Sequence, residues 1–134
     1  MKLIYALVCD HAFLSIDRKV NIIGVFETIN AVSFPVNHQK FTLVGSVAPS
    51  KDKFKMAIDI VAEGTGKSIL KDTQERDVVL PPNNGGKNFN FIIEILNTVF
   101  PQAGYFLVKI IIDGEAVSSL KLLLLQTTEN KTLN

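Results

Sequence analysis

The sequence predicts an all-β protein, an antiparallel β-sandwich of about seven to eight strands. Short apolar runs alternate with Gly, Pro and Asn turn signals from end to end, which is typical of sandwiches and barrels. No stretch combines a long helical period with capping residues. The strongest single signal lies in residues 104–125, where an Asp113-Gly114 turn separates two strand-like runs.

The N-terminal residues predict the first strand. Leu3, Tyr5 and Leu7 alternate with other apolar residues, as in a strand buried on both faces. The apolar stretch at 3–9 is too short for a convincing export signal. A turn is expected at residues 17–19, followed by a largely apolar second strand at 20–26 that Gly24 interrupts.

The middle of the chain predicts further strands. Pro35 marks a bend, because proline cannot donate to a central ladder, and a third strand follows at 41–47. Residues 53–63 alternate apolar and charged side chains and form the clearest half-buried strand. Residues 89–95 repeat that pattern. Residues 92–99 also fit helical spacing, but the Phe and Ile content and the following Phe100-Pro101 favour a strand and then a loop. The intervening residues 63–90 should hold one or two short strands and a loop.

The register of the last hairpin follows from its hydrophobic pattern, because a slip of one residue moves every side chain to the other face. A two-residue loop would mix apolar and polar residues on both faces. A three-residue loop at 112–114 gathers Phe106, Val108, Ile110 and Leu122 on one face. We therefore predict that loop, with Gly114 in a left-handed G1 bulge.

The totals restrict the class of protein. The 134 residues indicate one domain over 1–126 and a polar C-terminal tail at 127–134. The net charge is +1 without a Lys/Arg cluster, so no nucleic-acid partner is expected. No run approaches the ~20 apolar residues of a membrane span. The single cysteine, Cys9, excludes an internal disulfide and fits a reducing, cytoplasmic location.

Two loops are candidates for binding a small ligand or phosphate. Residues 64–68, with Lys67 and Ser68, look like the end of a phosphate-binding loop, and residues 81–87 supply Asn84 and Lys87. The full motif would need a glycine where Val61 stands and a helix afterwards. A Gly-rich turn between strands is therefore the preferred interpretation.

The soft metal ligands are Cys9, His11 and His38, which can meet only if His38 folds back beside the first strand. A zinc site wants four ligands, or three and water. An enzyme using Cys9, Asp10 and His11 is the second alternative function. We expect neither metal nor cofactor, assign no catalytic residue, and do not expect an enzyme.

Several segments together resemble a known family. They are residues 1–10, residues 19–26 (Lys-Val-Asn-Ile-Ile-Gly-Val-Phe), Phe34-Pro35, residues 100–106 and residues 112–114. The chain resembles a bacterial family of short all-β proteins known only as a domain of unknown function. The resemblance implies a single sandwich-like bacterial domain and carries no catalytic assignment.

The sequence does not specify a function, and a non-catalytic binding or assembly module is the first hypothesis. Residues 3–8, 20–26 and 122–125 are apolar on both faces, although the outer face of a sandwich is normally solvated. Loops or a partner must cover them. We expect a homo-oligomer, such as a homodimer through one outer face or edge, or another protein as partner.

Overall fold

The computed structural model describes residues 1–71, 73, 75–82 and 84–128, and within them it contains strands and no helix. The nine strands are β1 (Lys2–Leu14), β2 (Val20–Val25), β3 (Thr28–Ala31), β4 (Val36–Ala48), β5 (Lys53–Ala62), β6 (Arg76–Val79), β7 (Phe89–Phe100), β8 (Gly104–Ile112) and β9 (Glu115–Gln126). The all-β prediction is confirmed. In this part of the chain, no helix is long and apolar enough to cross a membrane.

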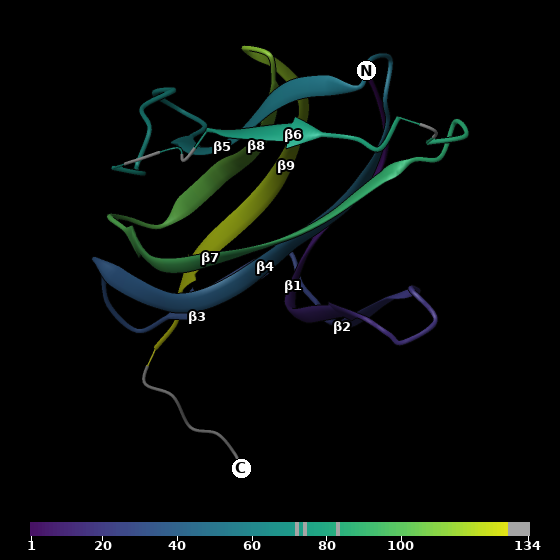
Figure 1. Cartoon of the computed structure of the whole chain (residues 1–134). Helices are drawn as coiled ribbons and strands as arrows, with labels where there is room; N and C mark the ends of the chain where they lie inside the picture. Colours follow the sequence, from purple (N-terminus) through teal and green to yellow (C-terminus); the bar gives the residue numbers. More distant parts are fainter. Residues whose placement is uncertain (72, 74, 83, 129–134) are drawn as a thin grey trace.

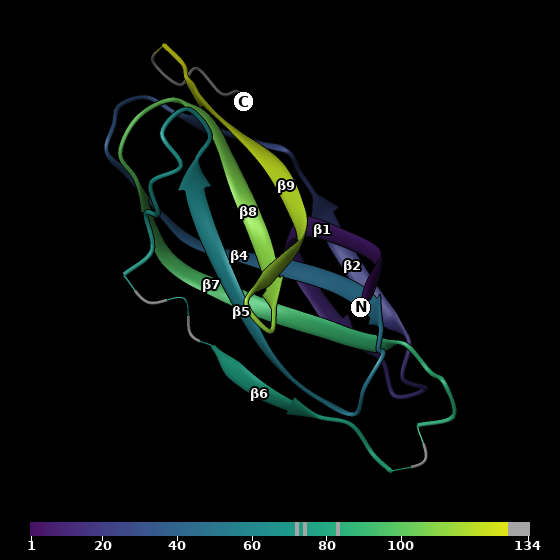
Figure 2. The same cartoon turned by 90° about the horizontal axis from the view of Figure 1, so that it is seen from above.

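The strands form two sheets that lie across one another (Figures 1 and 2). The first has four strands in the order β2-β1-β4-β7, and the second has five in the order β3-β9-β8-β5-β6. All neighbours are antiparallel except β3 and β9, which are parallel. The four-stranded sheet curls, and β1 runs from the N-terminus at the top of Figure 1 to β2 at the bottom.

The prediction of a sandwich is therefore confirmed only in part. The described residues form nine strands instead of seven or eight, one pair is parallel, and a curled half-barrel lies beside a second sheet. The added strand is β3, whose four residues are too short to show an alternating pattern. The long β1 also carries a register shift between Leu3 and Tyr5, and such irregularities increase local twist.

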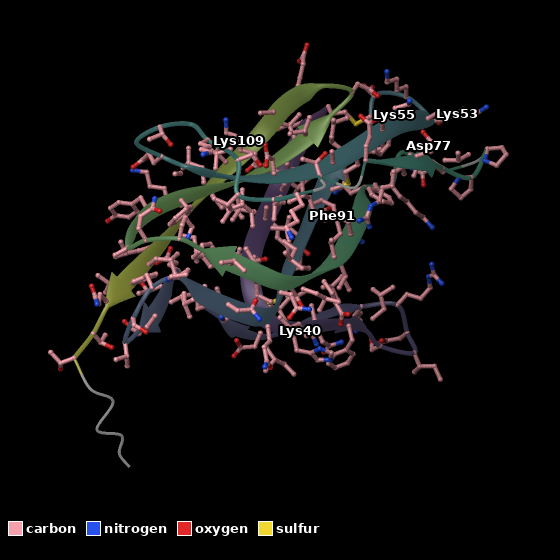
Figure 3. All side chains as sticks on the ribbon, turned by 90° about the vertical axis from the view of Figure 1, so that its left-hand side faces the viewer. Lys40, Lys53, Lys55, Asp77, Phe91 and Lys109 are labelled. Atoms are coloured by element: carbon pink, nitrogen blue, oxygen red, sulfur yellow. The ribbon has the colours of Figure 1, made fainter. Side chains whose placement is uncertain are left out.

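The main core lies between the two sheets. Phe41 and Phe100 from the curled sheet and Phe106 from the second sheet are fully buried. The Phe100 and Phe106 rings pack edge to face with centroids 5.2 Å apart, a favourable aromatic geometry. Phe91 points from β7 into the same space (Figure 3). These contacts join the sheets through one continuous cluster.

The last hairpin corrects one prediction and confirms another. The loop has two residues, and both Asp113 and Gly114 have positive φ (50° and 84°), as in a type I′ turn. The expected three-residue loop is therefore wrong. A register shift between Ile110 and Ile111 restores the predicted apolar face, which holds Phe106, Val108 and Leu122, although Phe106 lies opposite Leu122 and not opposite Leu120 as the predicted loop requires. The extra residue that the prediction placed in the turn is Val117, which lies unpaired in β9 between Ala116 and Ser118.

The strand interpretation of residues 89–95 is confirmed, and β7 continues to Phe100. Its alternation changes phase at Asn97, which has a φ of 52°. Before that residue, Phe91 and Ile93 are buried; beyond it, Thr98 and Phe100 are buried. The same strand therefore presents odd-numbered and then even-numbered residues to the core.

Candidate protein-interaction surface

The β1–β2 hairpin carries several exposed large apolar side chains. We call residues 10–25 the arm; it holds the end of β1, a turn and all of β2. One face of the arm packs on a second, smaller cluster, in which Ala12 joins Cys9 and Val44, with Val20 and Ile22 packed against it. Within the described residues, this is the face of the arm that packs against the rest of the fold.

The rest of the arm exposes large apolar side chains. Phe13 is 40% exposed, Ile23 and Val25 are each 54% exposed, and Ile16 is fully exposed in the turn. With Leu14, the arm holds five of the twelve large apolar side chains that are exposed in the described part of the chain. Single exposed apolar residues are normal, whereas several on one hairpin are a candidate binding surface. The strand register places Phe13 and Ile23 on one face of the hairpin and Leu14 on the other. The arm is therefore the main candidate for an interaction surface.

The outer edge of β2 is also unpaired. β2 is the first strand of its sheet and, in the described part of the chain, is hydrogen-bonded to β1 alone. Edge strands of monomers are commonly blunted by charges, proline or a bulge. β2 contains neither charge nor proline. Its one irregularity is Gly24, with a φ of 73° beside the Asp10 carboxylate.

Two opposite charges flank β2. Lys19 precedes the strand and Glu27 follows it by two residues. In the turn, Ser15 accepts the amide hydrogen bond of Arg18 at 2.8 Å, and the Ser15 hydroxyl donates to Asp17. This bond holds the pKa of the Asp17 carboxyl below its ordinary value. Lys19 pairs with Asp17 at 3.4 Å, but both side chains are largely exposed, and such pairs contribute little.

The residues considered as metal ligands or nucleophile are not gathered into a site. Cys9 is fully buried in the second cluster, and burial raises the pKa of its thiol, which disfavours the reactive thiolate. The exposed His11 ring lies against Phe13, with centroids 5.7 Å apart. His38 contacts Phe26 and Phe41 instead. Among the described residues, no group of three or more His, Cys, Asp or Glu could hold a metal ion.

The two loops predicted to bind a ligand lie at opposite ends of β5. Lys67 and Ser68 follow its last residue, whereas Leu80 donates to Asp52 just before its first residue. The ten residues of β5 separate these ends by roughly 30 Å. The loops therefore do not form one site, and their ligand binding stays a prediction.

The polar side chains of these loops satisfy their own turns. The Ser68 hydroxyl donates to Asp59 at 2.5 Å, and the Lys67 amide donates to the Thr65 hydroxyl at 3.2 Å. In the other loop, the Asn84 side chain donates to the Lys87 carbonyl at 2.6 Å. Asn83 lies outside the described residues, as do residues 129–134 of the predicted polar tail.

Two groups of residues that the fold places at candidate sites were not identified from the sequence. The first is Lys19 and Glu27, which could have been found because they flank the apolar run 20–26. A second group, made of Lys71, Arg76 and Thr98, lines a groove beside β7. More than twenty positions separate Arg76 from Thr98, and no spacing signal links them.

The fold and the exposed edge define a small all-β domain without a recognisable catalytic motif. Residues 4–124 match the model of a family of unknown function, DUF6941, and the chain belongs to that family. The resemblance inferred from the sequence is thereby confirmed, while a bacterial origin stays a prediction. No curated protein matches the chain.

Solved structures also match the chain. One is the Pseudomonas fluorescens alkylpurine DNA glycosylase AlkC bound to DNA containing an abasic site analog. The identity is 13% and the TM-score is 0.45; the match covers 90% of this chain and 30% of that one. This chain therefore spans less than a third of that structure's length, and a likeness of this level carries no functional argument.

The match nevertheless bears on one expectation. The low net charge and the lack of a Lys/Arg cluster led to the prediction of no nucleic-acid partner. The matching structure is that of a DNA-bound protein, so the prediction is contradicted and is withdrawn. The likeness does not assign DNA binding to this chain. Net charge over a whole chain does not describe one face of it, so the exclusion is not kept.

Proposed function

We propose that the protein is a non-catalytic assembly module that forms a homodimer through the outer edge of β2. The observation that carries the proposal is an uncharged edge strand on an arm whose apolar side chains are exposed. Antiparallel pairing of β2 with the same strand of a second copy would satisfy its free backbone groups. Because each copy uses the same edge, a two-fold interface closes at the dimer.

The charges around β2 select one register. If Ile23 of one copy lies opposite Ile23 of the other, the symmetric register brings Lys19 toward Glu27 at both ends of the pair. The Glu27 carbonyl already accepts the Leu123 amide of β9 at 2.9 Å, so only the side chains of these two residues would meet. The six residues of β2 itself are uncharged, so no like charges meet. A shift of the register by one residue would place Lys19 opposite Phe26 and lose both charge pairs.

The surface that such pairing removes from water is mainly apolar. Burying one exposed Ile or Val side chain contributes about 1.5–3 kcal/mol, and Ile23 and Val25 are each half-exposed in the single chain. Stable interfaces bury about 800 Å² per partner, more than a short strand edge offers alone. Phe13, Leu14 and Ile16 supply further contact area on the same arm.

Charge reversal tests both the interface and its register. Lys19→Glu and Glu27→Lys should each weaken the dimer about tenfold, since each places two like-charged pairs in the interface. The double variant should recover most of the affinity, because the charges are exchanged. A mixture of the two single variants should form heterodimers preferentially, which native mass spectrometry resolves by mass.

Three results would contradict the proposal. If the double variant dimerises no better than either single variant, the register is wrong. If the mixture contains only the statistical share of heterodimer, Lys19 and Glu27 do not face each other. If the unmodified chain remains monomeric at millimolar concentration, the assembly function itself fails. A cytoplasmic location is also proposed, supported by the free and buried thiol of Cys9.

A further inference from the structure

We propose that a groove between β7 and the segment that follows β5 binds a small amphiphilic carboxylate, an organic acid with an apolar body. The groove has a volume of about 430 Å³, within the range of small-molecule sites. The groove lies at the β7 edge of the curled sheet, and β2 forms the opposite edge of that sheet. The inference is therefore independent of the assembly proposal.

The groove exists because the two sheets part at their edges. β7 is the last strand of the curled sheet. The segment after β5 follows the edge of the second sheet, where Ile69 donates to the Ile60 carbonyl at 2.9 Å. Figure 3 views this side of the molecule, with β5 and β6 above β7 and with Phe91 between the sheets. The groove opens beside that core, between β7 and the segment with Ile69 and Arg76.

The floor of the groove is apolar. Ile58 and Ile93 are buried core residues, and Ile69, Leu70 and Ile95 are half-buried. The floor therefore suits a hydrocarbon body, which gains free energy in proportion to the apolar area removed from water. A fully polar ligand such as inorganic phosphate would leave this floor uncompensated.

The rim of the groove carries positive charge. Lys71 and Arg76 both line it. Among the described lining residues the one carboxylate is Glu94, and Lys40 neutralises it at 3.3 Å. An Arg guanidinium can hold a carboxylate with two parallel hydrogen bonds. The rim therefore favours an anionic head group over a cationic one.

A buried hydroxyl gives independent support for a polar head group. Thr98 is 2% exposed and lines the groove, and its Oγ1 has no hydrogen-bond partner among the described residues. Buried polar atoms normally have a partner, because leaving one unpaired is costly. The change of phase at Asn97 is what turns Thr98 inward. His38, which lies opposite Thr98 on β4, also has a ring nitrogen without a partner among the described residues. A ligand carboxylate that reaches the Thr98 hydroxyl would accept its hydrogen bond.

Decanoate is a suitable probe, with decanol and decyltrimethylammonium as neutral and cationic analogues of the same chain length. Binding is followed by the amide shifts of β7 in two-dimensional NMR and by calorimetry. Decanoate should bind saturably, and the two analogues should bind at least about tenfold more weakly. The shifts should centre on Ile93, Ile95 and Thr98.

Three variants separate the groove from the rest of the surface. Arg76→Gln should weaken decanoate binding about tenfold, and Thr98→Val, which keeps the shape of the side chain, about threefold. Lys53→Gln is the matched control, because Lys53 lies on the outer side of the second sheet (Figure 3) and should leave binding unchanged. The proposal is overturned if decanoate shows no saturable binding, if decanol binds equally well, or if Arg76→Gln has no effect.

Discussion

The space between the two sheets and the β1–β2 arm contain the same kinds of side chain in opposite environments. Phe106 and Ile60 are fully buried between the sheets, whereas Phe13 and Ile23 on the arm are 40% and 54% exposed. The fold explains the apolar residues of the first region and not those of the second. The fold therefore buries the apolar residues of its core and leaves those of the arm exposed.

The largest expected effect compares two phenylalanines. Phe106→Ala removes a fully buried ring that packs on Phe100, and should lower the free energy of unfolding by about 3–5 kcal/mol. Phe13→Ala should lower it by less than about 1 kcal/mol, since its ring is partly solvated, but should weaken the proposed dimer. Chemical denaturation and sedimentation velocity measure the two quantities. Equal losses of stability would erase the distinction between core and arm.

Two glycines give a second comparison. A Cβ on Gly45 would lie 2.5 Å from the Phe91 ring and 2.7 Å from the Tyr5 carbonyl oxygen. Gly45→Ala should therefore cost about 3 kcal/mol of stability, because neighbouring strands must move apart. On the arm, the atoms nearest to a Cβ on Gly24 belong to the Asp10 side chain, which can rotate. The positive φ of Gly24→Ala costs about 1–2 kcal/mol.

Gly64→Ala is the control for both changes, since a Cβ at Gly64 would meet nothing within 4 Å. Its effect on the free energy of unfolding should stay within about 0.5 kcal/mol. If Gly45→Ala were as mild as this control, the close approach of β1, β4 and β7 would not be part of the stable fold.

The smallest expected effect is a pH dependence at the boundary between the regions. Burial lowers the pKa of His38, against a smaller opposing effect of Asp10. The unfolded chain therefore takes up this proton first as the pH falls below about 6.5, and the free energy of unfolding decreases there. Below the folded-state pKa the loss levels off.

Denaturation at pH 7 and pH 5 measures this contribution. His38→Gln should reduce the difference in stability between the two pH values, because glutamine does not titrate. His11→Gln should retain the difference, since the exposed His11 ring lies on the arm. An unchanged difference in His38→Gln would assign the acid sensitivity to other groups.

Hydrophobic alternation along the sequence correctly predicted individual strands and the faces that they bury. The alternation from Phe54 to Ala62 and the apolar face of Phe106, Val108 and Leu122 follow from the period of a strand, and their burial confirms them. The predicted length of the loop at Asp113 was wrong. One extra residue can lie in the turn or later in the strand, and either position leaves the same residues on the apolar face. Hydrophobic pattern alone does not distinguish these cases.

Non-local features could not be predicted in the same way. β3 pairs in parallel with β9, almost a hundred positions away, and four residues carry too little pattern to show it. The apolar excess of residues 20–26 was visible, but that β2 lies at an edge depends on the strand order. The groove residues Arg76 and Thr98 meet only through the arrangement of both sheets.

The most direct test of the account is the sedimentation velocity of the unmodified chain beside Ile23→Lys, from micromolar to millimolar concentration. Val79→Lys is the control, because Val79 is a 67% exposed apolar residue on β6, the edge strand of the other sheet. We predict a dimer for the unmodified chain and for Val79→Lys, and a folded monomer for Ile23→Lys. A dimer that survives Ile23→Lys, or a monomer in every sample, would contradict assembly through β2.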